Sequence, residues 1–317
     1  MAIDCLSAGI LVADHLCEPI PRLPVAGELI QCDRLMLSIG GCASNVATDL
    51  ARLGVRVGAA GCIGRDLFGQ YIRQTLAAGG VDVEHLCELP GVDTSTTLII
   101  NVVNEDRRFI HCGAANWHFR AEHLPWEAAK AARVVYVGGY LLMKALDPHE
   151  LADCFRRLRA AGVKTVLDVV LPGPGVFWPQ LAPVLPHTDV FLPNTDEAAT
   201  ITGLAAPAEQ ALRFHEAGAG TVVITCGGQG SLLVSAGERL RAGVYPVAFR
   251  GGTGSGDAFV AGYISGLLRG ESTEGCLRWG TAVGASCVRS ISATDSVFTR
   301  SEAEAFLSRE RLAVESW

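Results

Sequence analysis

The sequence predicts an α/β fold in which helices cover both faces of a parallel β-sheet. Short apolar runs, typical of strands buried on both faces, alternate with helical patterns along most of the chain. The 317 residues, 49% of them hydrophobic, suffice for one large domain with a small appendage. We expect strands at 132–140, 164–170, 188–194 and 221–228, and helices at 148–161, 196–202 and 207–217.

Both ends of the chain fit this scheme. The opening MAIDCLSAGILVADHL predicts a buried strand; a signal peptide is not expected, because a basic region is lacking and Asp4 and Asp14 interrupt the apolar run. The apolar segment 134–143 is too short to span a bilayer. The tail 301–312 predicts a terminal amphipathic helix.

Two stretches break the alternation. Residues 14–38 contain three prolines followed by an apolar pattern, and residues 94–112 predict two strands joined by a polar turn at 104–107. Since neither stretch shows the helix expected of a strand–helix–strand unit, we predict antiparallel strands that form a small sheet outside the main one.

Charge and cysteine content disfavour several classes of protein. The net charge of −7 and the absence of a long basic run argue against nucleic acid or an anionic membrane as a partner. Eleven cysteines, an odd number without a C-x-x-C pair, lie mostly in apolar segments. We expect reduced, buried thiols in a cytoplasmic protein, and no metal site.

The segment GGTGSGDAFVAGYISGLLRG (251–270) predicts an anion-binding loop followed by a helix. Its glycines let backbone N–H groups approach an anion, and the positive end of the helix adds to the attraction. Asp257 could accept a proton from an attacking hydroxyl, or it could simply cap the helix. No lysine follows the glycines, so a Walker A loop is not expected.

Three further motifs each allow a functional and a structural interpretation. Asn45, after Gly40 and Gly41, could bind a polyol or cap its own helix. Asn194 and Glu197 could hold Mg²⁺ through water or form a capping box. TCGGQGSLLV (225–234) suits nucleotide phosphate or ribose, or a hairpin turn. GAAGCIG (58–64) lacks the spacing of a dinucleotide fingerprint, which disfavours an NAD-linked oxidoreductase.

Taken in order, these motifs resemble the ribokinase-like (PfkB-type) carbohydrate kinase family over nearly the whole chain. The similarity lies in GGCASNVATDLARLG, IGRDLFGQYIRQTLAAGGVD, DVFLPNTDEAATITG, TCGGQGS and TGSGDAFVAGY. It implies a three-layer α/β/α sandwich with a mostly parallel central sheet and a small β-sheet lid. The main domain would comprise 1–13, 39–93 and 113–317, the lid would comprise 14–38 and 94–112, and lids would pair in a homodimer.

The resemblance implies transfer of the γ-phosphoryl group of ATP to a hydroxyl of a sugar or sugar-like molecule. Asp257 would be the general base beside an anion hole made by the N–H groups of Gly254, Ser255 and Gly256. Glu197 would hold Mg²⁺ through water. The remaining residues would bind substrate (Asp14, Gly40, Gly41 and Asn45) and nucleotide (Asn194, Thr225, Gly227 and Gly230).

The chain departs from the family in three places. Gly251-Gly252-Thr253 stands where Asp-Thr-Thr is usual; the missing carboxylate commonly helps form a monovalent-cation site, so activation by potassium is in doubt. Val12 replaces an amide of some ribose-binding members, and 138–147 lacks an acidic side chain placed like theirs, which disfavours ribose. Alternative functions are a nucleoside kinase and a non-catalytic sugar-binding sensor. Arg107, His111 and Asn116 are further candidates for substrate contact.

Overall fold

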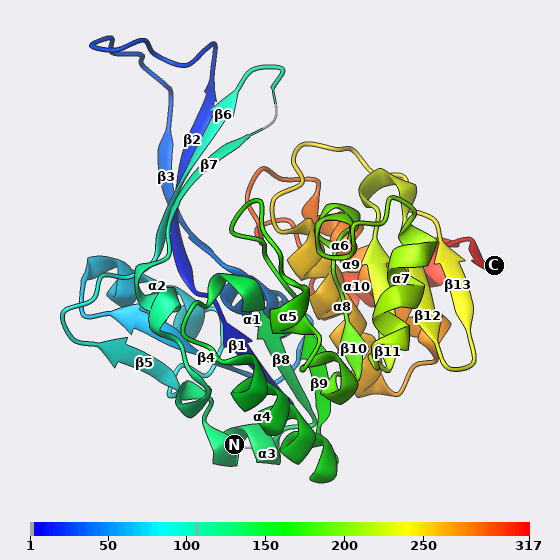
Figure 1. Cartoon of the computed structure of the whole chain (residues 1–317). Coiled ribbons are helices and arrows are strands. Elements are labelled where there is room, and N and C mark those ends of the chain that lie inside the picture. Colours follow the sequence, from blue (N-terminus) through cyan, green and yellow to red (C-terminus); the bar gives the residue numbers. More distant parts are fainter. Residues whose placement is uncertain (1–2, 106) are drawn as a thin grey trace.

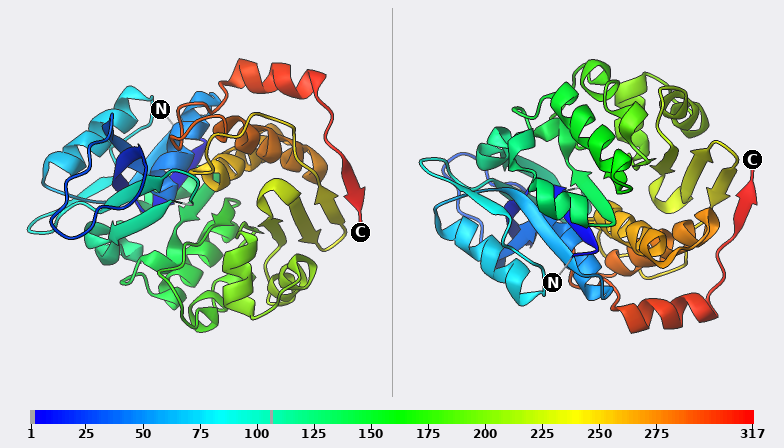
Figure 2. Two further views of the ribbon diagram at one scale, coloured as in Figure 1. Left: turned by 90° about the horizontal axis from the view of Figure 1, so that it is seen from above. Right: turned by 90° about the horizontal axis from the view of Figure 1, so that it is seen from below.

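The protein folds as a large mixed sheet between two layers of helices, with a separate small sheet rising from one side (Figures 1 and 2). The computed structural model describes residues 3–105 and 107–317. No described helix has both the length and the apolar character needed to cross a membrane. This architecture confirms the predicted fold class.

The large sheet has ten strands in the order β14-β13-β12-β11-β10-β9-β8-β1-β4-β5. Strands β11 through β5 in this order are parallel, whereas β12, β13 and β14 extend the sheet antiparallel. The bounds are β1 Cys5–Gly9, β4 Val57–Gly64, β5 Leu86–Leu89, β8 Val134–Gly138, β9 Lys164–Leu167, β10 Val190–Phe191, β11 Thr221–Thr225, β12 Ser231–Ser235, β13 Arg239–Ala242 and β14 Val314–Ser316.

Each of the four strand predictions contains one of these strands, and the segment 58–64 lies within β4. The strands β1, β4 and β8 are buried along their whole length, because helices cover both faces of the sheet.

One helical layer contains α1, α8, α9 and α10, which contact one another, and the other contains α4 and α7 (Figure 2). The bounds are α1 Cys42–Arg52, α2 Leu67–Ala78, α3 Trp126–Ala131, α4 Pro148–Ala160, α5 Trp178–Leu181, α6 Thr195–Thr202, α7 Pro207–Glu216, α8 Ser255–Arg269, α9 Thr273–Cys287 and α10 Arg300–Arg309. The predicted helices at 148–161, 196–202, 207–217 and 301–312 correspond to α4, α6, α7 and α10.

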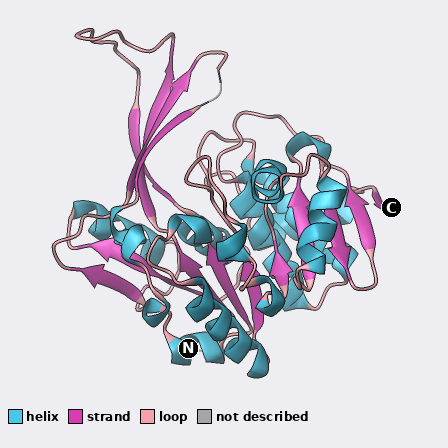
Figure 3. Ribbon diagram, in the orientation of Figure 1, coloured by secondary structure: helices cyan, strands magenta, loops and turns pink. Residues whose placement is uncertain are grey.

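The small sheet has the order β3-β2-β6-β7 and stands apart from the main body (Figure 3). Its strands are β2 Val12–Ile20, β3 Leu35–Gly40, β6 Thr96–Val102 and β7 Arg108–Cys112. We call this sheet the lid. The prediction that it is wholly antiparallel is wrong, because its central pair β2–β6 is parallel. Both central strands lead outward from the body, and each returns through an antiparallel edge strand.

Candidate active site

A cleft of about 680 Å³ opens beside the carboxyl end of β11 and the start of α8. It unites residues from three of the predicted motifs: Asn194, the glycine-rich turn 225–234 and the Gly-rich loop. Apolar side chains that sequence reasoning did not single out, among them Val244, Val247 and Val288, form part of its wall. The predicted residues that line the cleft are Asn194, Thr225, Gly227, Gly230, Ser255 and Gly256.

The glycines of the turn after β11 keep backbone close to this cleft. A Cβ atom on Gly227 would meet no atom within 4 Å, so the backbone there borders open space. Gly230 has φ +91°, and a Cβ atom would lie 2.0 Å from the Ala242 carbonyl oxygen. Only glycine fits this position, which fixes the turn against β13.

Asp257 lies in the first turn of α8, but its side chain does not cap that helix. The N-cap position is Gly254, without a side-chain capping bond. Asn45 instead donates from Nδ2 to Asp257 Oδ2 at 2.8 Å. Burial raises the pKa of Asp257, and hydrogen bonds from Asn45 and Cys42 oppose this shift. The simple capping alternative is therefore not what the structure shows.

The Gly-rich loop has two backbone N–H groups without an acceptor among the described residues at the start of α8. Gly254 has φ +76°, a left-handed conformation that favours glycine. Its N–H and that of Gly256 have no acceptor among the described residues, as expected for the first turn of a helix. Ser255 differs, because its N–H donates to the Gly252 carbonyl at 3.2 Å.

Asp14 of β2 and Gly40 of β3 lie close together near the base of the lid, although the strand register pairs Asp14 with Ser38 and Gly40 with Val12. Asp14 is only 8% exposed, and a Cβ atom on Gly40 would lie 1.9 Å from its Oδ2. A glycine is thus required where the carboxylate rests. The pKa of Asp14 is raised to about 7, mainly by burial; a hydrogen bond with Thr97 opposes the rise, and the charge of Asp257 contributes to it.

Gly41 and Asn45 belong to the start of α1. Gly41 is the N-cap at φ +87°, and a Cβ atom there would lie 2.6 Å from the Ile10 carbonyl oxygen. Asn45 is 4% exposed, and its Oδ1 has no hydrogen-bond partner among the described residues. A buried amide oxygen without a donor is costly, so this atom suits a ligand hydroxyl.

Asn194 and Glu197 form the predicted capping box at the start of α6. Asn194 Oδ1 accepts from the N–H groups of Asp196 and Glu197, while Glu197 Oε2 accepts from the Asn194 N–H at 2.9 Å. The pKa of Glu197 is raised to about 7, mainly by burial; hydrogen bonds with Asn194 oppose the rise, and the charge of Asp257 contributes to it. The second carboxylate oxygen of Glu197 makes no hydrogen bond of its own within the described part of the chain.

Sequence reasoning missed Asp168 and Cys42. Asp168 follows β9 directly and accepts hydrogen bonds from Tyr136 Oη at 3.1 Å and from the Val169 N–H at 2.8 Å. Ligand atoms of Cys42, Asp168 and Asp257 lie within 4.8 Å of one another. Burial raises the pKa of Asp168 well above its ordinary value, and Glu197 and Asp257 add to the shift. Its position after a parallel strand was the available signal.

The three further candidates for substrate contact, which lie in or near the lid, separate in the structure. Arg107 lines the cleft and donates from Nη1 to Thr253 Oγ1. His111 contacts Thr97 within the lid, with Nδ1 3.0 Å from Oγ1. Asn116 is buried and bonds both the N–H and the carbonyl of Leu11, so it has a structural role.

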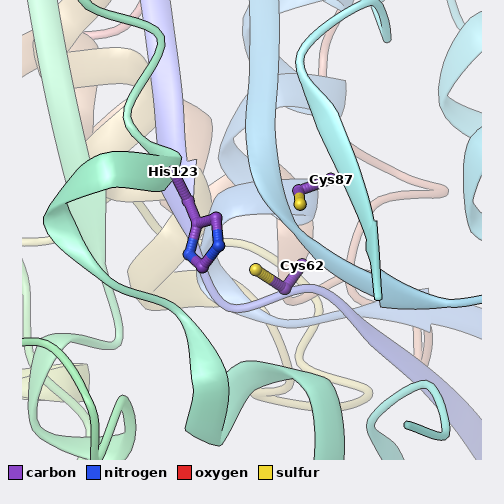
Figure 4. A group of neighbouring side chains, drawn as sticks. All are labelled: Cys62, Cys87 and His123. Atoms are coloured by element: carbon purple, nitrogen blue, oxygen red, sulfur yellow. The ribbon is translucent and has the colours of Figure 1, made fainter. Parts of the chain in front are cut away.

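A cluster outside the cleft contains Cys62, Cys87 and His123, whose side chains point toward one another (Figure 4). The two cysteines are directly paired across β4 and β5. His123 Nδ1, however, accepts the Arg120 N–H at 2.9 Å, so the neutral ring carries its proton on Nε2. This hydrogen bond argues against a metal-ligand role for the group.

The chain resembles characterised kinases along its length. It is 28% identical to ribokinase of Haemophilus influenzae, covering 94% of this chain and 96% of that protein. It is 30% identical to 2-dehydro-3-deoxygluconokinase of Bacillus subtilis, covering 90% and 91%. The structure of Arabidopsis thaliana ribokinase complexed with ribose and ATP superposes with a TM-score of 0.84 at 24% identity, over 98% of this chain and 100% of that one.

The profile of the pfkB family of carbohydrate kinases matches residues 5–300, which include all the predicted motifs and the lid. The chain therefore belongs to the pfkB family of carbohydrate kinases, and it is a phosphotransferase that uses an alcohol group as the acceptor.

Proposed function

We propose that this protein transfers the γ-phosphoryl group of ATP to a hydroxyl of a sugar or sugar-like molecule, with Asp257 as the general base. The observation that carries the proposal is the position of Asp257. Its carboxylate is bonded to Asn45, and the preceding residues Ser255 and Gly256 line the cleft. One group thus lies between the proposed sugar site and the proposed phosphate site.

In this mechanism the acceptor oxygen attacks the γ-phosphorus atom while its proton passes to the Asp257 carboxylate. The bond from phosphorus to the bridging oxygen breaks, and ADP leaves with that electron pair. Free N–H groups at Gly254 and Gly256 would stabilise charge on the transferred group. The pKa of Asp257, raised by burial, favours proton acceptance, although phosphoryl transfer depends mainly on positioning.

Magnesium fits the group of carboxylates near Asp257. The charge of Asp257 raises the pKa of both Asp168 and Glu197, and Glu197 raises that of Asp168. A divalent cation would relieve this repulsion, and carboxylate oxygens are the ligands that Mg²⁺ prefers. Glu197 would hold the ion through water, and the ion would neutralise phosphate charge.

The proposed acceptor site combines Asp14, Gly40, Gly41 and Asn45. The Asn45 Oδ1 lone pairs suit a hydroxyl donor, and a carboxylate or carboxyl at Asp14 suits a second hydroxyl. The relatives act on several sugars, which leaves the specific sugar open to a screen. A nucleoside is the second candidate, since nucleoside kinase of Methanothermobacter thermautotrophicus is 27% identical over 88% of this chain.

We further propose that the nucleotide is held by Asn194, Thr225, Gly227 and Gly230, and that the protein acts as a cytoplasmic homodimer paired through its lids. Several apolar side chains on the lid support pairing, because they are exposed in the single chain: Leu35, Leu37, Leu98, Phe109 and Ile110. Eleven free cysteines support a reducing compartment.

The test is ADP release with MgATP and a panel of sugars, sugar acids and nucleosides. Asp257→Asn should lower kcat for the active acceptor by about 100- to 10,000-fold, with MgATP affinity retained. Asp153→Asn removes an exposed carboxylate on α4 and serves as the matched control. Parental turnover in Asp257→Asn would show that another group is the base.

A further inference from the structure

Arg107 is a lid residue that reaches the Gly-rich loop of the main body. It lies in the turn between β6 and β7, 146 positions before Thr253 in the sequence, and its Nη1 donates to the Thr253 hydroxyl. Its guanidinium also stands over the Phe109 ring, with 5.6 Å between Cζ and the ring centroid. These two contacts orient the charged group toward the loop.

The glycine at 252 leaves room for this guanidinium. A Cβ atom on Gly252 would lie 3.6 Å from Arg107 Nη2, in van der Waals contact with the charged group. The threonine that the family usually carries at this position would place further atoms beside the guanidinium. The departure at Gly252 and the placement of Arg107 are therefore two parts of one arrangement.

The guanidinium also brings a positive charge to the cleft that is proposed to bind the phosphates of ATP. Among the described residues that line the cleft, Arg107 is the one Lys or Arg. It lies close enough to Cys287 to oppose the rise that burial imposes on the pKa of that thiol. Cys287 Sγ in turn contacts the carbonyl oxygens of Thr253 and Ala293, so the charge lies beside the loop that bears Gly254.

We propose that Arg107 is the fixed cation of the phosphoryl-transfer site, contacting the terminal phosphates of ATP and replacing the charge that a monovalent cation supplies elsewhere in the family. This inference rests on the proposed kinase function. A guanidinium suits the role because its planar fork matches two phosphate oxygens. The lost carboxylate at position 251 fits as well, since a guanidinium held by its own chain needs no carboxylate to bind it.

The test is calorimetric binding of MgATP and of AMP to the full chain. Arg107→Met should weaken MgATP binding roughly 10- to 100-fold, because a charge-assisted contact is lost, while AMP binding stays unchanged. The MgATP affinity of Arg107→Lys should lie between those of the parental chain and Arg107→Met, because lysine keeps the positive charge and lacks the planar guanidinium. Arg108→Met is the matched control, because Arg108 is an exposed neighbour that pairs with Glu105.

Two further measurements make the inference specific. Gly252→Thr should weaken MgATP binding in the parental chain and should have no additional effect in Arg107→Met, since both changes remove the same contact. Replacing choline chloride by potassium chloride at constant ionic strength should leave parental binding and turnover unchanged.

Equal MgATP affinity in the parental chain and Arg107→Met would overturn this inference and leave the kinase proposal standing. Strong potassium activation of the parental chain would also overturn it. Absence of MgATP binding by the parental chain would overturn the proposed function, and this inference with it.

Discussion

Replacing Asp14 by asparagine should make the protein more stable at pH 8 while it impairs the site. Asp14 is an almost fully buried carboxyl whose pKa is raised by burial from the ordinary 3.8 to about 7. Between these two values the folded chain retains a proton that the unfolded chain has lost. The free energy of unfolding therefore falls as pH rises through this window. Above pH 7 the ionised Asp14 carboxylate lowers it by roughly 4 kcal/mol in full.

The assay is urea unfolding at pH 5 and pH 8. This carboxyl should account for roughly 2–3 kcal/mol of the stability lost between the two pH values, and Asp14→Asn should lack that part of the loss. Asp153→Asn is the control, because the pKa of this exposed group is lowered by Arg156 and it stays ionised throughout. Identical pH dependence in the parental chain and Asp14→Asn would refute the reasoning. Loss of acceptor binding in the stabilised variant would show that the buried charge serves function.

Three other substitutions separate folding from function. Gly254→Ala should destabilise the fold by at least about 1–2 kcal/mol, since its φ is +76° and a Cβ atom would lie 2.5 Å from the Ala293 carbonyl oxygen; thermal unfolding measures this. Gly256→Ala has open space and should preserve the melting temperature, yet its methyl group should weaken MgATP binding in calorimetry. Glu197→Gln keeps an acceptor for the Asn194 N–H, so stability should change little, whereas the Mg²⁺ concentration for half-maximal ADP release should rise about tenfold or more. An unchanged Mg²⁺ requirement would place the ion elsewhere.

Features that depend on near neighbours in the sequence were predicted well. The alternation of apolar runs identified the strands, because burial on both faces leaves a continuous apolar pattern. The capping box of Asn194 and Glu197 follows from a spacing of three residues within one helical turn. The antiparallel pair β6–β7 follows from two strand patterns separated by a short polar segment, 104–107, of which residue 106 lies outside the described residues. In each case the interacting groups are separated by a few residues, so the local pattern contains the information.

The pairing within the lid was not available from such patterns. The sequence predicts antiparallel strands in 14–38 and 94–112, but the order β3-β2-β6-β7 and the parallel central pair depend on where each strand leaves the body. Local sequence patterns do not contain the roles of the site residues either. The family resemblance suggests these roles, and the substitutions above test them.

By itself, the sequence determined the alternating α/β order, the Gly-rich loop before α8 and the family to which these motifs belong. The tertiary structure decided which distant groups meet. Asn45 and Asp257 are 212 positions apart and share a hydrogen bond, Asp168 reaches the same point from the end of β9, and Arg107 arrives from the lid. The physical reason is that parallel strands bring their carboxyl ends to one edge of the sheet, and the packing of helices and lid there fixes which side chains come into contact.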